Sequence, residues 1–515
     1  MRLRAKVEKD PNLNIQETLT FLDDVKELFD LLSVLSKFGG TVDIKHEDEQ
    51  TQAMLRLMAY LQKSDRHDMY VKYVYRLHKI HLELGNHSES AEVLLMHASY
   101  PWKNGADVPE FWCEEFDWPR ESISDRQARV YRHAVDIFDA GKNWEKCVEY
   151  CDKLKSYYER TFAYDQVASV LREQASYFEM VTEKKRFYPT HFRVSFIGFA
   201  YDTDISNKVF VYRGRPLESI MDFCTRIRQK FSETKTVPPG KETNEMKTSL
   251  TTKYIQISTV TPAFDEEIEH KLPSWMGPKA TPNVVDYRRN FDTGVFWLSR
   301  PFRKAKEKSK NEFMDLWNKK IFLRTSFRFP GLQRRAEVAG TIEHFQNPLE
   351  VAVETVLQKN KDLKRQIAIA EKLDGRTATQ SFTMAINGTV DAAVNGGIAN
   401  YAPFLNGSFR EDHPEIAEDI ASTEEKSKML EVLNSALEDH LVILKKGVVV
   451  HARVCIEQMI PLHEMIAKKF PILLEQIEKL GVKVPAFFAP PAKVTPPASK
   501  KDMLMKRKLS RRRML

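Results

Sequence analysis

Residues 193–213 read RVSFIGFAYDTDISNKVFVYR, and this stretch marks a change from helix to sheet along the chain. Two runs of β-branched and aromatic residues, 193–199 and 208–213, enclose a polar Asp-Thr-Asp-Ile-Ser-Asn segment of the kind that forms turns. Before this stretch, apolar residues recur at helical spacing instead. The sequence therefore predicts that a β domain begins near Tyr188-Pro189 in an otherwise largely helical chain.

The β domain extends well beyond these two runs. One helix is expected over residues 217–231, and long polar connections such as 232–253 join the other elements. Three further runs have strand character, namely 254–260 (YIQISTV), 295–298 (VFWL) and 321–327 (IFLRTSF). The Pro330-Gly331 pair ends this pattern, so we expect a mostly antiparallel β domain over residues 188–332.

The residues before the β domain are expected to form a helical array. A helix is predicted over residues 15–38, with an apolar stripe of Leu22, Val25, Phe29, Leu32 and Leu35. The segments 84–91 and 140–147 resemble each other, because each combines a helix end, a glycine turn and a new amphipathic helix. This similarity indicates a degenerate helical-hairpin repeat over residues 1–187, which would offer surfaces rather than chemistry.

Helical spacing returns at Pro348. Two apolar stripes support it, namely Leu349, Ala352, Val353, Val356 and Leu357, and then Leu430, Leu433, Leu437, Leu441 and Leu444. A last helix is expected to stop at Gly481, so residues 333–484 predict a bundle of about four helices. Residues 485–515 are Pro-rich and then basic, and we expect a disordered tail. The predicted fold is multidomain and mainly α, with a central antiparallel β domain.

The composition is that of a globular protein rather than a disordered or membrane protein. The 515 residues include 79 Lys and Arg, 72 Asp and Glu, and 42% hydrophobic residues, and this length suggests about three domains. The charged N-terminus lacks the apolar run of a signal peptide, and no apolar stretch reaches about 18 residues. We therefore expect a soluble cytoplasmic protein whose five cysteines form no disulfide framework.

Motifs for bond-making chemistry are missing from the sequence. It contains no phosphate-loop, dinucleotide-binding, zinc-protease or nucleophile-elbow pattern. Cys147 and Cys151 have a spacing that could supply half of a metal site, but no second pair completes it, so we expect core thiols. His463 lacks a second histidine at ligand spacing, and we expect the His463-Glu464 pair on a helix surface. No metal, cofactor or enzymatic active site is predicted.

Residues 387–397 (NGTVDAAVNGG) interrupt a helical pattern in the C-terminal region. A helix is expected to approach over residues 377–385, and an apolar pattern resumes over 398–405. Each glycine inside a helix costs about 1 kcal/mol relative to alanine, so this insertion is costly unless it is used. Two interpretations remain open, an ordinary turn with Val394 packed in the core or a functional loop with Val394 at its tip.

Several other short motifs occur along the chain, and residues 387–397 form the most specific motif. The others are Tyr254-Ile255-Gln256, Ser299-Arg300-Pro301, Asn311-Glu312-Phe313 with Trp317, Pro330-Gly331 and Pro348-Leu349-Glu350. Together with the order of the three predicted lobes, they resemble the DOCKER domain, the catalytic region of the DOCK family of Rho-GTPase exchange factors. The resemblance covers residues 10–480, approximately, and is greatest to the Rac-directed subfamily that includes a nematode cell-corpse engulfment protein.

The resemblance implies a guanine-nucleotide exchange factor that binds a Rac-type GTPase, preferentially in its nucleotide-free form. The first lobe would form a homodimer, and the other two lobes would contact the GTPase. A valine corresponding to Val394 would act as a nucleotide sensor and exclude Mg²⁺ from the GTPase. The implied sensor loop is Val394, Asn395, Gly396 and Gly397. The implied GTPase-binding residues are Tyr254, Gln256, Phe291, Phe296, Arg300, Tyr401 and Phe404.

A structural interpretation remains open for some of these residues. Tyr254, Gln256, Phe291 and Phe296 are equally suited to a sheet core, and Trp317 is better suited to a core than to a contact. The alternative function is a non-catalytic helical-repeat scaffold that binds SH3-domain or membrane partners through its tail.

The tail carries the whole net charge of the chain. Residues 498–515 contain eight basic residues and one acidic residue, and the net charge of the chain is +7. The expected contact residues for an anionic membrane at the inner face of the plasma membrane, or for a partner, are Lys506, Arg507, Lys508, Arg511, Arg512 and Arg513. The Pro490-Pro491 and Pro496-Pro497 pairs suggest weak SH3 ligands. No aromatic residue follows Phe488, so nucleic-acid binding is not expected.

Overall fold

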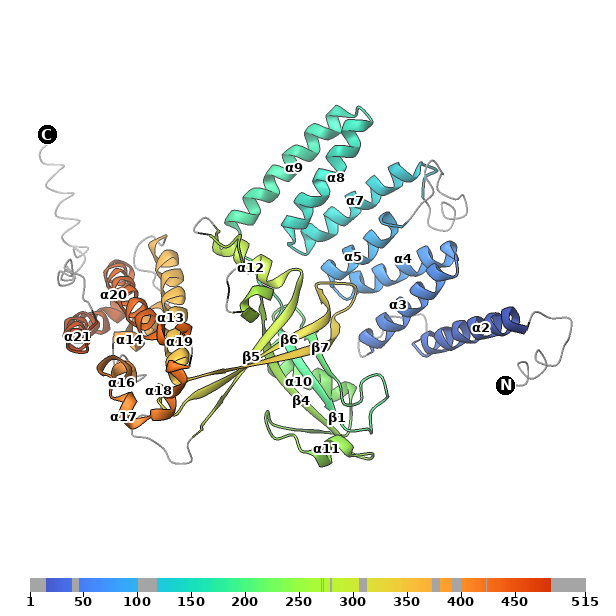
Figure 1. The fold of residues 1–515 in the computed structure, drawn as a ribbon. Coiled ribbons are helices and arrows are strands. Elements are labelled where there is room, and N and C mark those ends of the chain that lie inside the picture. Colours follow the sequence, from blue (N-terminus) through green and yellow to red (C-terminus); the bar gives the residue numbers. More distant parts are fainter. Residues whose placement is uncertain are drawn as a thin grey trace, which may run out of the picture. The chain divides into compact units, whose positions relative to one another are not determined.

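The protein is described by a computed structural model that covers residues 15–38, 46–100, 118–269, 271, 273–277, 280–304, 313–372, 380–390, 400–422 and 424–482. The chain divides into two compact units. The first unit comprises Met1–Leu298 and Ile321–Ile342, and the second comprises Ser299–Lys320 and Glu343–Leu515. Three strands of the sheet, labelled β5, β6 and β7 in Figure 1, contain residues of both units.

The first unit begins with an array of helices, as the sequence predicts, and each helix packs on the next one along the chain (Figure 1). The helices are α2 (Ile15–Ser36), α3 (Glu47–Lys63), α4 (His67–Glu83), α5 (His87–Ala98), α7 (Ile123–Ala140), α8 (Trp144–Arg160) and α9 (Tyr164–Glu183). Two apolar cores hold the array together. One lies mainly between α3 and α4, and the other joins α5, α7, α8 and α9.

The same turn joins four pairs of helices in this array, although the sequence revealed only two of them. At each turn one residue has a positive φ, and the next N–H donates to the carbonyl five residues earlier, as in a Schellman motif. The positive-φ residues are Asp65 (59°), Gly85 (72°), Lys142 (57°) and Phe162 (59°). The hydrogen bonds are Arg66 to Leu61 (2.9 Å), Asn86 to His81 (2.8 Å), Asn143 to Phe138 (2.8 Å) and Ala163 to Tyr158 (3.0 Å).

Replacing Phe162 with glycine is expected to stabilise the first unit by about 0.5–1 kcal/mol. The left-handed backbone conformation costs a side-chain-bearing residue about 1–2 kcal/mol, part of which the greater freedom of glycine in the unfolded chain offsets. Little packing is lost, because Phe162 is 75% exposed. Urea unfolding measures the change. The matched control is Gly85→Ala, for which no atom would touch the new Cβ but the φ of +72° remains strained. A loss of stability in Phe162→Gly would contradict the prediction.

Six strands of the first unit form a closed, barrel-like sheet. They are β1 (His191–Ile197), β2 (Val209–Arg213), β4 (Lys253–Ala263), β5 (Thr293–Phe302), β6 (Trp317–Phe329) and β7 (Arg335–Gln346). The order β1-β2-β7-β6-β5-β4 closes because β1 also pairs with β4 in antiparallel fashion. The ring fixes its register at His191, which lies opposite Arg213 on one side and Val260 on the other. A short strand, β3 (Thr234–Thr236), adds to β4 in parallel.

Short helices lie in the connections between the strands of this sheet. They are α10 (Ile220–Lys230), α11 (Asn244–Thr248), the 3₁₀ helix η1 (Asp265–Glu269) and α12 (Pro282–Asn290). Phe223 of α10 stacks on Phe192 of β1 with ring centroids 4.1 Å apart, which anchors α10 to the sheet. Ser219 and Asp222 form a capping box that starts α10 three residues later than expected.

The expected end of the β domain at residue 332 lies before its last strand. Strand β7 was missed because its residues alternate between polar and small types, and only Arg335, Ala336 and Gln346 are buried. The sequence also predicted separate domains over residues 1–187 and 188–332. In the structure, the helical array and the sheet belong to one compact unit.

The second unit is the predicted helical bundle. Its long helices are α13 (Pro348–Glu371), α14 (Gln380–Val390), α20 (Met429–Val454) and α21 (Ile460–Lys479). Shorter helices lie between α14 and α21, namely α16 (Ala402–Asn406), α17 (Phe409–Asp412), α18 (Pro414–Ala421), α19 (Glu424–Ser427) and η3 (Glu457–Met459). A capping box of Asn347 and Glu350 starts α13, and a single apolar core joins the helices.

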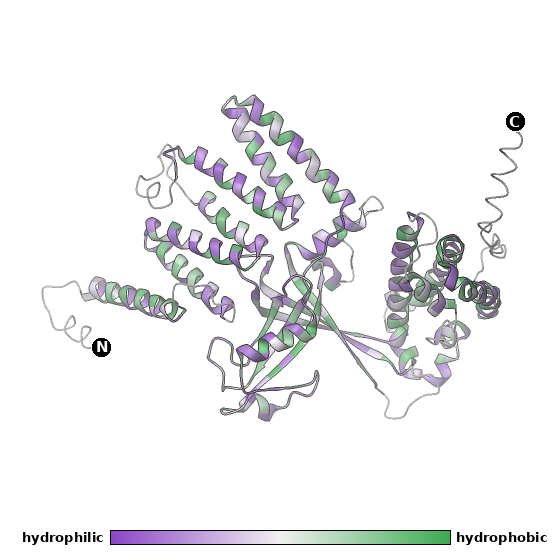
Figure 2. Cartoon of the chain, turned by 180° about the vertical axis from the view of Figure 1, so that it is seen from behind, coloured by the Kyte–Doolittle hydropathy of each residue, from purple (hydrophilic) through white to green (hydrophobic). Residues whose placement is uncertain are grey.

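Two of the predicted apolar stripes differ from the buried faces. In α2, Leu35 is buried, but Phe29 is 68% exposed and Phe21, on the same side of the helix, is 63% exposed. Figure 2 shows hydrophobic and hydrophilic residues interspersed along this helix. In α13, Leu357 is exposed while the other four residues of its stripe are buried. In the described parts of the chain, no helix combines the length and apolar character that a membrane span requires.

Candidate functional site

The predicted sensor residues follow helix α14 along the chain. Val394, Asn395, Gly396 and Gly397 lie outside the described residues, which stop at Val390 and resume at Asn400. The helix before the loop is longer than the sequence predicts, because α14 continues through Asn387 and Gly388 to Val390. Its last turn, from Asn387 to Val390, is therefore helical and part of the bundle.

Apolar packing fixes the position of α14 in the bundle. Phe382, Ile386 and Val390 lie one helical turn apart and are at most 4% exposed. Gly447 of α20 lies opposite, where a Cβ atom would come within 3.5 Å of Ile386 Cδ1 and 3.3 Å of Ile367 Cδ1. The absence of a side chain at Gly447 thus lets α20 approach both α13 and α14 closely.

A buried polar contact also connects α14 to the last two long helices. Thr383 Oγ1 lies 2.9 Å from His451 Nε2, and His451 Nδ1 lies 2.9 Å from His463 Nδ1. Burial, together with the neighbouring His463, lowers the pKa of His451 to about 4. The expected surface position of His463 is wrong, because its side chain is fully buried. Its partner across the bundle is on a separate helix, so sequence spacing along α21 could not reveal the contact.

The chain that follows the predicted loop packs into the same core. Tyr401 and Phe404 are buried, with 4% and 3% of their surface exposed. The Tyr401 ring meets the edge of Phe313 at a centroid distance of 5.6 Å, and Phe404 contacts Phe409 at 5.5 Å. These two predicted GTPase-binding residues therefore hold the returning chain in the bundle. A small pocket lies here, lined by Val356, Lys359, Gly388, Thr389, Tyr401, Leu437 and His440.

In the first unit, the four predicted GTPase-binding residues occupy different environments. Tyr254 is half-buried on β4, and Phe291 is half-buried after α12, where it stacks on Tyr287 at 4.9 Å. Gln256 and Phe296 are fully buried. The sequence allowed either a GTPase contact or a core position for these residues, and Gln256 and Phe296 lie in the core.

Gln256 and Phe296 both contact other residues of the first unit. Gln256 Oε1 accepts a hydrogen bond of 2.7 Å from Arg193, and its Nε2 donates to the Pro238 carbonyl at 3.0 Å. Phe296 lies 4.8 Å from the His191 ring and 5.8 Å from Phe329. Both side chains support the sheet on which the more exposed residues lie.

Arg300 and Trp317 belong to the second unit. Arg300 is half-buried near the end of β5. Trp317 is 2% exposed in the core of the bundle, as its core interpretation predicted, and the Lys304 ammonium lies 3.4 Å from its ring centroid. Such a cation over an indole ring is favourable where both groups are partly desolvated.

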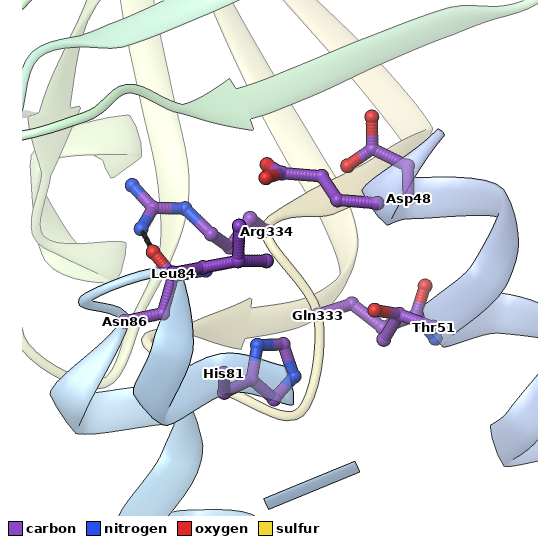
Figure 3. A pocket seen from close by; sticks show the side chains of 8 residues that line it. Asp48, Thr51, His81, Leu84, Asn86, Gln333 and Arg334 are labelled. Carbon is purple, nitrogen blue, oxygen red and sulfur yellow. Dashed lines mark hydrogen bonds between the residues drawn. The ribbon is translucent and has the colours of Figure 1, made fainter. Parts of the chain in front are cut away.

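A buried ionic cluster that the sequence did not reveal joins α5 to the sheet. Glu89 is fully buried, and its carboxylate lies 2.6 Å from Arg213 Nη1. Burial opposes its ionisation, but Arg213 and Arg334 hold the pKa of Glu89 at about 2. Arg334 donates to Asn86 and to the carbonyls of Arg213 and Gly214. Figure 3 shows the Arg334–Asn86 bond beside a pocket that His81 and Asp48 also line.

A second cluster joins α3 to α10 and β7. Lys230 of α10 lies 3.0 Å from Asp48 and 2.7 Å from Glu49, and Arg335 lies 3.0 Å from Glu49. Burial again opposes ionisation, while Lys230 and Arg335 lower the pKa of Asp48 to about 2. The partners are separated by more than a hundred residues, so no local spacing could have predicted these pairs.

The described residues contain no group of three or more His, Cys, Asp or Glu side chains placed to bind a metal ion. Cys147 and Cys151 are fully buried in α8. Burial raises the pKa of both thiols, that of Cys151 to about 12. Both cysteines are core thiols, as the sequence predicted.

Two family models match the chain, and both fall on the regions just described. The model "DHR-2, Lobe B" matches residues 240–328, which contain Tyr254, Gln256, Phe291, Phe296 and Arg300. The model "DHR-2, Lobe C" matches residues 369–480, which contain the interruption at 387–397. DHR-2 is the second DOCK-homology region, for which DOCKER is another name.

Three curated relatives are 24–28% identical to this chain over the aligned residues. Dedicator of cytokinesis protein 3 of Homo sapiens is 26% identical over 419 residues, covering 80% of this chain and 20% of the relative. Dedicator of cytokinesis protein 4 of Homo sapiens is 28% identical over 415 residues, with the same two coverages. DOCK-like protein 1 of Saccharomyces cerevisiae is 24% identical over 472 residues, covering 90% of this chain and 23% of the relative.

The chain spans about a fifth of the length of these relatives. Lobe B and lobe C match in the order in which the sequence places the β domain and the bundle. The chain is therefore similar to the DHR-2 region of DOCK-family proteins over both of these segments.

Proposed function

We propose that this chain is a guanine-nucleotide exchange factor for a Rac-type GTPase of the Rho family. The observation that carries the proposal is that residues 387–397 lie within the lobe C match and begin in the last turn of the well-anchored helix α14. The preference for Rac, and similarity to the engulfment protein, rest on the resemblance of the short motifs alone. The associated cellular roles would be cytoskeletal control in cell migration and phagocytosis.

The proposed mechanism requires no bond-making chemistry from this chain. Mg²⁺ neutralises the phosphate charges of GDP in a GTPase, so its exclusion leaves those charges without a counter-ion. Val394 is suited to exclude the ion because an aliphatic side chain offers it no ligand. Asn395, Gly396 and Gly397 would let the backbone approach the GTPase closely.

Exchange then follows from linkage between two binding reactions. A protein that binds the nucleotide-free GTPase more tightly must weaken nucleotide binding by the same factor. The buried positions of Phe382, Ile386 and Val390 support this role. A loop can displace a bound ion only if the helix that carries it stays fixed in the bundle. Entry of GTP with a new Mg²⁺ would displace the sensor and complete the cycle.

Release of fluorescent GDP from a Rac-type GTPase, with and without this protein, tests the proposal. We expect faster release with the protein, and unchanged release would refute exchange activity. The alternative scaffold function predicts binding through the tail without exchange. The experiment needs the full chain, because cutting between the helical array and the β lobe would separate Glu89 from Arg213.

Homodimerisation through residues 1–187 is a further part of the proposal. Helix α9 supports it with an exposed apolar row at seven-residue spacing, Tyr164 (66%), Leu171 (43%) and Phe178 (55%). This spacing is typical of a seam between helices. Sedimentation equilibrium tests it, and a monomer at every accessible concentration would refute it.

Deletion of residues 498–515 is expected to abolish binding to anionic vesicles at moderate salt. Each Lys or Arg near an anionic surface contributes about 1 kcal/mol, and this segment contains eight. Such binding would bring a cytoplasmic protein to the inner face of the plasma membrane. Co-sedimentation with phosphatidylserine vesicles measures the effect, and retention of binding after the deletion would exclude the tail as the contact. A pull-down with SH3 domains tests the proline pairs separately.

A further inference from the structure

Thr383, on α14, takes part in two buried contacts of the second unit. Its Oγ1 lies 2.9 Å from His451 Nε2 on α20 and 3.4 Å from Met459 Sδ in η3. On the far side of the His451 ring, Nδ1 lies 2.9 Å from His463 Nδ1 of α21. Thr383, His451 and His463 are at most 1% exposed. The helices α14, α20 and α21, labelled in Figure 1, are therefore joined by directional contacts as well as by apolar packing.

The protons of these side chains give the hydrogen-bond chain a direction. Burial lowers the pKa of His451 to about 4 and also lowers that of His463, so both rings are uncharged at neutral pH. Each ring then carries one N–H, and Thr383 carries one O–H. His463 Nε2 is buried and has no hydrogen-bond partner within the part of the chain that the structure describes. The proton of His463 is therefore better placed on Nδ1, from which it donates to His451 Nδ1.

The other two protons follow from the first. Because His451 Nδ1 accepts, the proton of His451 lies on Nε2 and donates to Thr383 Oγ1. The Thr383 hydroxyl then donates to the Met459 sulfur, which is a weak acceptor. All three protons are paired in this order. The reverse order pairs two of them and leaves an N–H of His463 buried without an acceptor, which is less favourable than an unused lone pair.

We propose that Thr383, His451 and His463 are positioning residues for nucleotide exchange, because they fix the rotation of α14 about its axis and thereby the direction of the sensor. The proposal rests on the exchange function proposed above. Apolar packing is non-directional, so it limits the rotation of a helix less sharply than a hydrogen bond, which weakens steeply as its angle changes. Thr383 lies seven residues, about two turns, before the end of α14 at Val390. A rotation at Thr383 would therefore be carried along α14 to the residues that lead to Val394.

Thr383→Val tests this role, because valine keeps the shape of threonine and removes the hydroxyl. Release of labelled GDP is measured over a range of concentrations of a Rac-type GTPase, which separates kcat from KM. We expect kcat to fall about three- to tenfold with KM nearly unchanged, because the GTPase contacts remain while the sensor is misplaced. Thr383→Ser restores a hydroxyl and should exchange at nearly the wild-type rate.

Ile416→Val and Ile416→Ala are the matched controls. Ile416 is fully buried in the same apolar core but lies on α18. The two substitutions remove one and three carbon atoms, so their melting temperatures should bracket that of Thr383→Val. At a temperature at which all variants are folded, both controls should exchange like the wild type.

The tautomers of the two histidines provide a test that does not depend on exchange. Nitrogen-15 NMR of the histidine-labelled full chain should show His451 protonated on Nε2 and His463 on Nδ1. Protonation of His463 on Nε2 would overturn the hydrogen-bond chain and the role built on it.

Equal kcat values for Thr383→Val and the Ile416 controls would overturn the positioning role. A Thr383→Ser variant as slow as Thr383→Val would overturn it too, because the hydroxyl would then not matter. If the wild type does not accelerate GDP release, the exchange function fails, and the positioning role fails with it. If the wild type is active and Thr383→Val is unaffected, only the positioning role has failed.

Discussion

Replacing Glu89 with alanine is expected to lower the free energy of unfolding of the first unit by about 3–5 kcal/mol. Glu89 is fully buried on α5, and Arg213 and Arg334 are its nearest cations. Removing the carboxylate leaves both guanidinium groups of the β lobe without their buried counter-charge. The loss is much larger than that of an exposed ion pair, which contributes about 0–1 kcal/mol.

Urea unfolding followed by circular dichroism measures this change. Glu83→Ala is the matched control, because Glu83 is half exposed on the preceding helix and lies 3.9 Å from Lys79. Glu89→Gln should fall between the wild type and Glu89→Ala, because it keeps a hydrogen-bond acceptor and loses the charge. If Glu89→Ala were as stable as Glu83→Ala, the array and the β lobe would not depend on this pair.

Replacing Val394 with alanine is expected to slow catalysed GDP release about tenfold. The substitution removes two methyl groups from the proposed sensor, and their burial against the GTPase contributes about 1–1.5 kcal/mol to the transition state for release. Binding of the nucleotide-free GTPase should be largely retained, because the contacts of lobes B and C remain. Stopped-flow release of labelled GDP and a binding assay with the nucleotide-free GTPase separate the two effects.

Val449→Ala is the control for this experiment. It makes the same chemical change on α20, where Val449 is 52% exposed. Exchange by Val449→Ala should match the wild type. If Val394→Ala also exchanged at the wild-type rate, Val394 would not be the sensor, whatever the activity of the whole chain.

Sequence patterns predicted the parts of the fold that depend on local burial. Strands β1 and β2 were expected within two residues of their positions, because most of their residues are β-branched or aromatic and most are buried. Strand β7 is mostly half exposed, so its pattern carried no comparable signal. In α2 the apolar residues exceed what one face can bury, and Phe29 was assigned to the wrong side.

The candidate site was predictable to a different degree in each unit. The glycine-rich segment 387–397 is a local feature of the sequence, but its first residues are helical, because α14 extends to Val390. Lys359 and His440 are 81 positions apart along the chain and on separate helices, and only packing brings them to one pocket. The same is true of Glu89 and Arg213, whose pairing depends on how the array meets the sheet.

The most direct test of the proposed exchange mechanism compares GDP release from a Rac-type GTPase in saturating Mg²⁺ and in excess EDTA. If the sensor acts by excluding Mg²⁺, the protein should accelerate release strongly in Mg²⁺. In EDTA it should accelerate release only weakly, because the ion that it displaces is already gone. No acceleration in Mg²⁺, or the same acceleration factor in both solutions, would contradict the mechanism.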